Sequence, residues 1–236
     1  MTEKAKKLAI KRSRIVSGAI SKVDALKECI EPYKKDKNLL IYCGATTLFS
    51  EDLDDLDVTE DIRQIDYITK VIGSDLDMNV SQFTSKEDIP TRKNLIQHFK
   101  EGKELQGLVA IKCLDEGVNI SSIKTAFILA STTNPKEYIQ RRGRVLRKSF
   151  GKDYAEIFDF ITLPRPLDVV KNLTEEETTF DESLVKNELN RIIEFKSLSL
   201  NPYDSNPLID EIREIYNLYD EEFEDLDEYH FTLEED

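Results

Sequence analysis

The 236-residue chain has few of the residues on which disulfide-rich or zinc-binding folds depend. Its three cysteines, Cys29, Cys43 and Cys113, are odd in number and far apart in the sequence. The two histidines, His98 and His230, do not cluster with them. A zinc site needs closely spaced thiolates and imidazoles, and a disulfide framework needs paired cysteines. We therefore expect no metal site, and reduced thiols that are mostly buried.

Long apolar runs are also absent from the sequence. No apolar stretch approaches the ~20 residues that a membrane-spanning helix needs. The first residues, Met1-Thr2-Glu3-Lys4, lead into further charged residues rather than the apolar centre of a signal peptide. We expect a soluble, cytoplasmic protein without a membrane partner. Its length suits one domain of roughly 100 to 200 residues with appendages.

The formal net charge of −14 is unevenly distributed. Residues 1–40 hold eleven Lys and Arg against five Asp and Glu, and residues 41–170 hold seventeen against twenty-one. Residues 171–236 hold five against twenty-one. A strongly acidic protein would be a poor partner for nucleic acid, because phosphate binding needs a basic surface. Here the acidity belongs to the C-terminal segment, so the rest of the chain keeps that function open.

Short apolar strands alternate with amphipathic helices through the middle of the sequence. Strands are expected at 39–43, 79–83, 108–111, 125–130 and 155–160, and helices at 2–33, 62–73, 87–101 and 135–148. This alternation predicts an α/β fold, with a mostly parallel sheet covered by helices on both faces. Ligands of such sheets bind beyond the carboxyl ends of the strands, where the polar residues after Cys43, Ile111 and Ala130 collect.

The strand pattern stops after Pro164-Arg165-Pro166. Two acidic helices are expected at about 181–195 and 207–219, and residues 220–236 have too few apolar residues to fold alone. The predicted organisation has three parts. Residues 1–36 form an N-terminal helical linker, 37–166 form the α/β lobe, and 167–236 form an acidic helical tail.

The most informative stretch is the basic segment at residues 133–147. Asn134 suits the helix N-cap, Pro135 the first helical position, and Glu137 the reciprocal partner of a capping box. In the resulting helix, one amide and two guanidiniums fall at i, i+4 and i+7, on a single stripe. These residues are Gln140, Arg144 and Arg147, with Val145 and Leu146 turned elsewhere toward packing.

Two neighbouring cations repel, so this stripe favours a position opposite anionic oxygens. Arginine matches phosphate oxygens with its planar fork of donors. Gly143 inside the helix costs about 1 kcal/mol relative to alanine, which indicates a close approach by a phosphate or a facing protein lobe. A solvated basic helix face is the alternative for an arginine-rich run taken by itself.

The segment Gln140-Arg141-Arg142-Gly143-Arg144-Val145-Leu146-Arg147 resembles motif VI of superfamily 2 helicases, the DEAD/DEAH and DExH-like family. Residues 108–120 resemble motif V of the same family, and residues 39–44 resemble motif IV. The intervening Thr84-Ser85, followed by Arg92 and Phe99, is similar to the family's linking segment. The motifs occur in the family's order over residues 38–162.

The resemblance implies a RecA-like C-terminal lobe that closes over ATP and Mg²⁺ held mainly by a separate N-terminal lobe. It assigns Arg144 and Arg147 to the terminal phosphates, one of them as the arginine finger, and Gln140 to orienting groups around the γ-phosphate. An arginine delivered only in the closed state raises phosphoryl-transfer rates by about 10³ to 10⁵. Closure of the two lobes would then control hydrolysis.

The resemblance also implies two sets of binding residues. Those near ATP are Glu116, Gly117, Asn119 and Gly143, and those along DNA or RNA are Gly44, Thr84, Ser85 and Lys112. Asn119 stands where the family more often has Asp, and Lys112 stands near the position where it has a hydroxyl. Helix capping is an equally good explanation of Thr84 and Ser85. A lysine that simply leaves a strand for solvent explains Lys112 as well.

The other half of an ATP site is missing from the sequence. No Gly-x-x-x-x-Gly-Lys-Ser/Thr loop occurs, and no acidic box follows an apolar strand. Asp227-Glu228-Tyr229-His230 spells a DExH-like tetrapeptide, but it lies in the acidic tail without a preceding strand, and we attribute it to chance. We therefore expect this chain not to hydrolyse ATP alone.

Two classes of function remain open at this point. The first is the C-terminal lobe of an ATP-dependent nucleic-acid helicase or translocase, of a restriction or defence type. The second is a non-catalytic RecA-like module that binds protein or nucleic acid. The acidic tail would dock on a protein partner or imitate nucleic acid over the basic segment.

Overall fold

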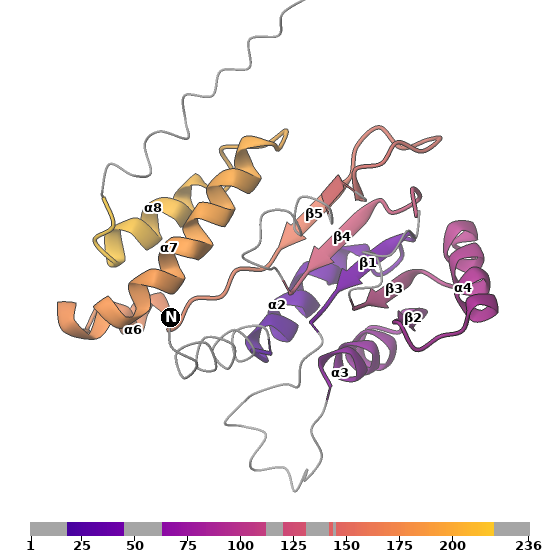
Figure 1. Cartoon of the computed structure of the whole chain (residues 1–236), viewed down its shortest axis with the longest axis horizontal. Coiled ribbons are helices and arrows are strands. Elements are labelled where there is room, and N and C mark those ends of the chain that lie inside the picture. Colours follow the sequence, from indigo (N-terminus) through magenta and orange to yellow (C-terminus); the bar gives the residue numbers. More distant parts are fainter. Residues whose placement is uncertain (1–17, 45–62, 112–119, 131–141, 144, 220–236) are drawn as a thin grey trace, which may run out of the picture. The chain divides into compact units, whose positions relative to one another are not determined.

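The chain forms a five-stranded sheet in which all strands are parallel (Figure 1). The computed structural model describes residues 18–44, 63–111, 120–130, 142–143 and 145–219. The strands follow the order β2-β3-β1-β4-β5 across the sheet. Their bounds are β1, Leu39–Tyr42; β2, Val80–Phe83; β3, Gly107–Ala110; β4, Thr125–Ile128; and β5, Glu156–Asp159.

Strand β1 lies at the centre and is paired on both sides. Leu39 lies opposite Gly107 of β3 and Thr125 of β4. Every residue of β1, β3 and β4 is buried, whereas the edge strands β2 and β5 are only partly buried. Strands buried on both faces have continuous rather than alternating apolar sequences, and the run at 39–42 has this character.

One face of the sheet is covered by helix α2, Ser21–Ile30, and helix α3, Gln64–Lys70. Leu39 and Ile41 point to this face because side chains alternate along a strand. Helix α3 continues into a π-helical turn, η3, at Val71–Asp75. The short 3₁₀ helix η1, Glu31–Tyr33, follows α2 and contains Pro32.

The opposite face is covered by helix α4, Ile89–Glu101, whose Phe99 is fully buried beside Leu40 and Tyr42. Its N-cap is Asp88, whose carboxylate accepts a hydrogen bond of 2.9 Å from the Thr91 amide. Hydrogen bonds from the side chain of Thr91 and from its amide lower the pKa of Asp88. The helix ends at Gly102, where a φ of 60° favours glycine.

The predicted fold class is confirmed: the sheet is parallel and has helices on both faces. The described part of the N-terminal segment packs on this sheet. Val23, Leu26 and Ile30 of α2 belong to the same core cluster as Leu39 and Ile41. The apolar face of this helix is therefore an integral layer of the α/β lobe. Residues 1–17 lie outside the described part of the chain.

The chain divides into two compact units, residues 1–161 and residues 162–236. The second contains helices α6, Leu167–Val170; α7, Glu175–Ser197; and α8, Asn206–Ile215. Helix α7 begins six residues before the predicted start at 181. A capping box formed by Thr174 and Glu177 fixes this earlier start.

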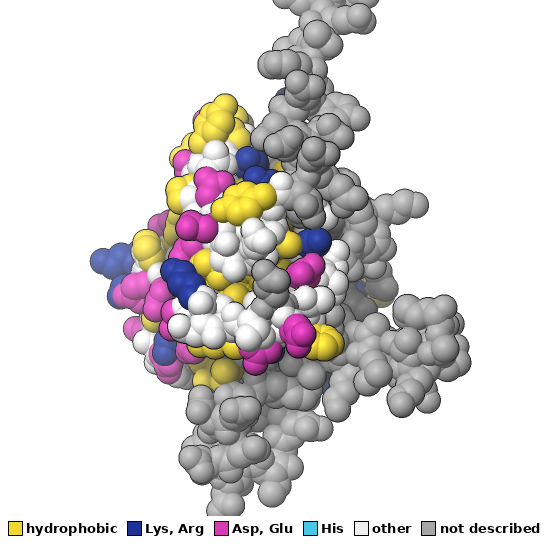
Figure 2. Space-filling model, turned by 90° about the vertical axis from the view of Figure 1, so that its left-hand side faces the viewer, with side chains coloured by type: hydrophobic (Ala, Val, Ile, Leu, Met, Phe, Trp, Pro, Cys, Tyr) yellow, Lys and Arg dark blue, Asp and Glu magenta, His cyan; other side chains and the backbone are white. Residues whose placement is uncertain are grey.

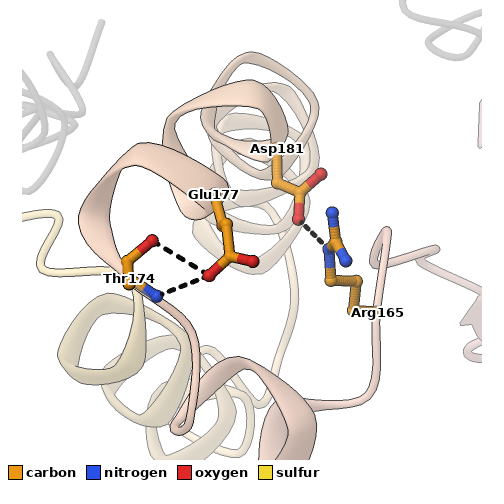
Figure 3. A network of polar contacts seen from close by, with 4 residues as sticks. All are labelled: Arg165, Thr174, Glu177 and Asp181. Atoms are coloured by element: carbon orange, nitrogen blue, oxygen red, sulfur yellow. Dashed lines mark hydrogen bonds and ion pairs between the residues drawn. The ribbon is translucent and has the colours of Figure 1, made fainter.

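The start of α7 is held by a small polar network (Figure 3). Glu177 accepts hydrogen bonds of 2.9 Å from both the amide and the hydroxyl of Thr174, and these bonds lower the pKa of Glu177. Arg165 donates from Nε to Asp181 at 2.8 Å, and this bond raises the pKa of Arg165. The connecting segment before α6 is therefore attached to α7 within the same unit.

The described surface is chemically mixed. On the face drawn in Figure 2, hydrophobic, acidic and basic side chains lie among one another, and the basic ones drawn there form no continuous stripe. Among the described residues, no helix is long and apolar enough to cross a membrane.

The place of α2 in the core can be tested by shortening a buried side chain. We expect Leu26→Ala, which removes a fully buried side chain, to lower the free energy of unfolding by about 2–5 kcal/mol. Glu28→Ala on the exposed side of the same helix is the control and should change it by less than about 0.5 kcal/mol. Chemical denaturation of the chain measures both. Equal, small effects would mean that α2 is not part of the folded lobe.

Candidate functional site

The carboxyl ends of the parallel strands meet at one edge of the sheet, and the chain continues the hydrogen-bond ladder there. The Cys43 amide donates to the Ala110 carbonyl at 3.0 Å, and the Leu129 amide donates to the Tyr42 carbonyl at 2.9 Å. These bonds fix the first residues after each strand. This edge is the common ligand-binding position of open α/β sheets.

Gly44 follows β1 at this edge and is held by a buried glutamine. Its amide donates to Oε1 of Gln64 at 2.8 Å, and Gln64 is completely buried at the start of α3. The side chain of Gln64 therefore fixes the backbone where the chain leaves the central strand. Sequence analysis missed this residue, since nothing in the local pattern distinguishes a buried glutamine from an exposed one.

Thr84 follows β2 and is engaged by its own chain. Its amide and its hydroxyl both bind the carboxylate of Glu87, at 2.6 Å and 2.9 Å, and its hydroxyl oxygen accepts from the Lys86 amide at 3.1 Å. Only 5% of the residue is exposed. The single hydroxyl proton of Thr84 is therefore used locally. The neighbouring Ser85 is exposed.

Arg92 of α4 supports the same turn. Its Nη2 donates to the Thr84 carbonyl at 2.7 Å, and its guanidinium carbon lies 5.8 Å from the centre of the Phe83 ring. The turn at 84–87 is thus closed from two sides, by the carboxylate of Glu87 and by this arginine. These contacts hold the backbone at Ser85 in place.

Part of the basic segment lies within the described residues. Positions 142, 143 and 145 are helical, and Val145 is buried in the core cluster on the α4 face. Among the described residues, a Cβ placed on Gly143 would meet no atom within 4 Å beyond the backbone of its own helix, which leaves open space there. Leu146 was predicted to pack inward, and this is wrong: it is 55% exposed.

The helix of the basic segment ends earlier than predicted. The Leu146 amide donates to the Arg142 carbonyl at 2.9 Å, but Arg147 lies beyond the helix. Lys152 donates from Nζ to the Val145 carbonyl and, at 3.1 Å, to the Arg147 carbonyl. This side chain ends the helix by taking carbonyl oxygens that a further turn would have used. Arg147 is exposed but does not continue the predicted helical stripe.

Arg142 is a buried member of the segment that sequence analysis did not single out. Only 6% of it is exposed, and burial lowers its pKa while the charge of Asp159, at the end of β5, acts in the opposite direction. A signal was available: Arg142 precedes the core residue Val145 by three positions, which places the two on one face of a helix.

A second buried cation lies at the end of β4. Lys22 of α2 is 6% exposed and donates from Nζ to the Leu129 carbonyl at 2.8 Å. It connects the N-terminal helix to the strand that precedes the basic segment. Its local pattern is that of an ordinary helical lysine, so only the packing of α2 on the sheet reveals its position.

The remaining predicted site residues are outside the described part of the chain. They are Gln140, Arg144, Lys112, Glu116, Gly117 and Asn119. Within the described ranges, no group of three His, Cys, Asp or Glu side chains could hold a metal ion. Cys29 and Cys43 are not joined in a disulfide.

The relation between Arg142 and Asp159 can be tested by removing the carboxylate charge. Asp159→Asn should lower the free energy of unfolding by about 1–3 kcal/mol, because it leaves a buried guanidinium with less compensating charge. Asp153→Asn, an exposed aspartate nearby, is the matched control and should be close to neutral. In an Arg142→Met background, the Asp159 substitution should cost less. Equal costs in both backgrounds would exclude the coupling.

The solved structures that match this chain do so at low sequence identity and with TM-scores below 0.5. The C-terminal part of the Fun30 ATPase domain is 23% identical, with 83% of this chain and 54% of that chain covered and a TM-score of 0.45. The C-terminal domain of the DEAD-box protein Dbp5 is 19% identical, with 61% and 72% covered and a TM-score of 0.43. E. coli SrmB, a DEAD-box protein bound to regulator of ribonuclease activity A, is 14% identical, with 58% and 69% covered and a TM-score of 0.42.

The chain therefore spans about half the length of the Fun30 structure. No curated protein matches it significantly. The model of the helicase conserved C-terminal domain matches residues 21–149, more than half of the chain. This match includes α2, in agreement with the place of that helix in the core, and it ends after the basic segment. On this evidence the chain belongs to the family of the helicase conserved C-terminal domain.

Proposed function

We propose that the chain supplies the C-terminal lobe of an ATP-dependent nucleic-acid helicase or translocase. The observation that carries this proposal is the family match over residues 21–149, which includes strands β1 to β4 of the parallel sheet and the whole basic segment. A separate N-terminal lobe, in the same chain or complex, would hold most of the ATP and Mg²⁺. This chain would not hydrolyse ATP by itself, since its sequence has neither a phosphate-binding loop nor an acidic box.

The basic segment would act on the nucleotide. Arg144 and Arg147 would reach the terminal phosphates when the lobes close, and Gln140 would orient groups around the γ-phosphate. The open space beside Gly143 supports this assignment, because a phosphate or a facing lobe could approach the backbone there. Delocalised guanidinium charge stabilises the charge that spreads over the phosphoryl oxygens during transfer. Glu116, Gly117 and Asn119 would line the same nucleotide from the motif V loop.

The strand ends would follow the nucleic acid. Gly44 lies two residues after the end of β1 and Ser85 two residues after the end of β2, at one edge of the sheet. Ser85 is the better hydroxyl donor of the Thr84-Ser85 pair, because the Thr84 hydroxyl already binds Glu87 and Ser85 is exposed. Lys112, which follows β3 and Ile111, would add a positive charge. DNA and RNA are both compatible with these contacts.

The acidic C-terminal segment would serve a different purpose. Residues 171–236 carry five basic against twenty-one acidic residues, so they would repel a phosphate backbone. Docking on a protein partner is one use, and occupying the basic segment in place of nucleic acid is another. An unchanged nucleic-acid affinity after deletion of residues 171–236 would exclude the second. The proposal of a role in restriction or defence is based only on the resemblance of residues 108–163 to such helicases.

The proposal is tested by steady-state ATP hydrolysis of the longest native chain that contains this segment, with its N-terminal lobe present. Hydrolysis should be stimulated by single- or double-stranded DNA or RNA. Arg144→Ala or Arg147→Ala should then reduce turnover by a hundredfold or more, about 2.7 kcal/mol of barrier.

Lys148→Ala is the matched control, because it removes an exposed positive charge next to Arg147. It should leave turnover within about twofold of the unsubstituted protein. An inactive native chain, or two arginine variants that behave like the control, would contradict the proposal. The non-catalytic module that binds protein or nucleic acid would then be the better account.

A further inference from the structure

The end of the basic segment is defined by one side chain that lies outside the family's motif. A helix leaves its last carbonyl groups without partners, and they must be satisfied by water, by side chains or by a tightened turn. Here Lys152 donates from Nζ to the Val145 carbonyl and to the Arg147 carbonyl, the second at 3.1 Å. Lys152 therefore binds the backbone on both sides of Leu146.

The backbone brings Lys152 to this position through a tight turn. The Lys152 amide donates to the Ser149 carbonyl at 3.1 Å, and the two residues form an antiparallel bridge. Gly151 at the third position has a φ of 72°, as a turn with a left-handed third residue requires. The reversal of the chain after Lys148 is thus built into the backbone. It directs the lysine side chain to the helix end.

The chemistry of Lys152 suits this contact. An ammonium group has three donors and a positive charge, and both are favourable at the carbonyl end of a helix. The side chain is half-buried, and burial lowers its pKa. Among the described residues, its polar contacts are backbone carbonyl oxygens rather than a carboxylate. A lysine that served only as a solvated surface charge would not be held in this way.

The need for this contact follows from where Arg147 lies. Val145 and Arg142 are both buried, so the helical part of the segment is fixed by packing. Arg147 lies beyond the last helical residue. The bond from Lys152 to the Arg147 carbonyl restrains that backbone directly.

We infer that Lys152 is a positioning residue for Arg147, holding the backbone from which its guanidinium extends toward the nucleotide. The inference rests on the proposed function, because it assigns a purpose to the position of Arg147. It adds a residue that does not touch the nucleotide itself. Arginine donors must be held to within a fraction of an ångström of the productive geometry, and a misplacement of 1 Å can reduce rates by about a hundredfold.

A double-mutant cycle in the longest native chain, with its N-terminal lobe, tests the inference. The variants are Lys152→Met, Arg147→Ala and the double variant, with Lys148→Met as the control of equal charge change on an exposed side chain. Lys152→Met should reduce kcat for ATP by about tenfold to a hundredfold, with a smaller change in KM. In the Arg147→Ala background it should cause no further loss, because a positioning residue has nothing left to position.

The outcomes separate the two proposals. If Lys152→Met lowers kcat by the same factor in both backgrounds, its effect is general destabilisation and the inference is wrong. If Arg147→Ala lowers kcat and Lys152→Met does not, the inference is wrong and the proposed function stands. If neither Lys152→Met nor Arg147→Ala lowers kcat, the proposed role of Arg147 is wrong, and the inference that rests on it is wrong as well.

Folding is checked by the thermal unfolding midpoint of each variant. Should Lys152→Met fail to fold, Lys152→Gln replaces it in the same cycle, because it removes the charge but stays polar at a half-buried position. Lys152→Arg should retain kcat within about threefold, since it keeps the charge and two donors. A loss in Lys152→Arg equal to that in Lys152→Met, which has no donor, would show that donation to the two carbonyls is not what matters.

Discussion

Strand β1 is hydrogen-bonded on both sides, and the other described features of the α/β lobe depend on that arrangement. Because β3 and β4 pair with it in parallel, the three strands end at one edge and bury both of their faces. Parallel strands require crossover connections, and here α3, between β1 and β2, covers one face while α4, between β2 and β3, covers the other. Helix α2, which precedes β1, packs on the same face as α3. Residues far apart in the sequence, such as Gly44 and Ser85, are thereby brought to one edge.

Buried polar side chains stabilise the backbone where it leaves this sheet. Gln64 holds the amide of Gly44, Glu87 closes the turn at Thr84, and Lys22 binds the carbonyl of Leu129. Each such contact satisfies a backbone or side-chain group that the end of a strand would leave unpaired. Polar groups of this kind cost free energy when buried alone, so their pairing specifies one geometry for the edge. Lys152 does the same at the end of the basic helix.

Much of the lobe could be predicted from sequence because its strands are buried on both sides. The apolar run at 39–43 and the one at 125–130 were read correctly as strands, and the start of α4 follows from Asp88 and the proline after Ile89. The end of the basic helix was not predicted. Arginine and leucine are good helix formers, so the local sequence pattern predicts a helix that continues to Lys148.

Tertiary contacts determine the features that the local sequence pattern did not predict. The helix stops because Lys152, returned by the turn at Gly151, takes its carbonyl oxygens, and this competition is invisible in a helical pattern. Arg142 and Gln64 are buried polar residues whose partners, Asp159 and Gly44, come from other elements. The early start of α7 had a readable signal in Thr174 and Glu177, which form a capping box. The packing of α2 on the core required the fold itself.

The central claim is that the basic segment stabilises the transferring phosphoryl group rather than simply binding nucleotide. It is tested most directly by the affinity of the longest native chain, with its N-terminal lobe and Mg²⁺, for ADP with aluminium fluoride and for ADP alone. A transition-state contact strengthens binding of the analogue selectively. We predict that Arg147→Ala weakens binding of ADP with aluminium fluoride by at least about tenfold more than binding of ADP. Equal weakening of both, or none, would contradict the account.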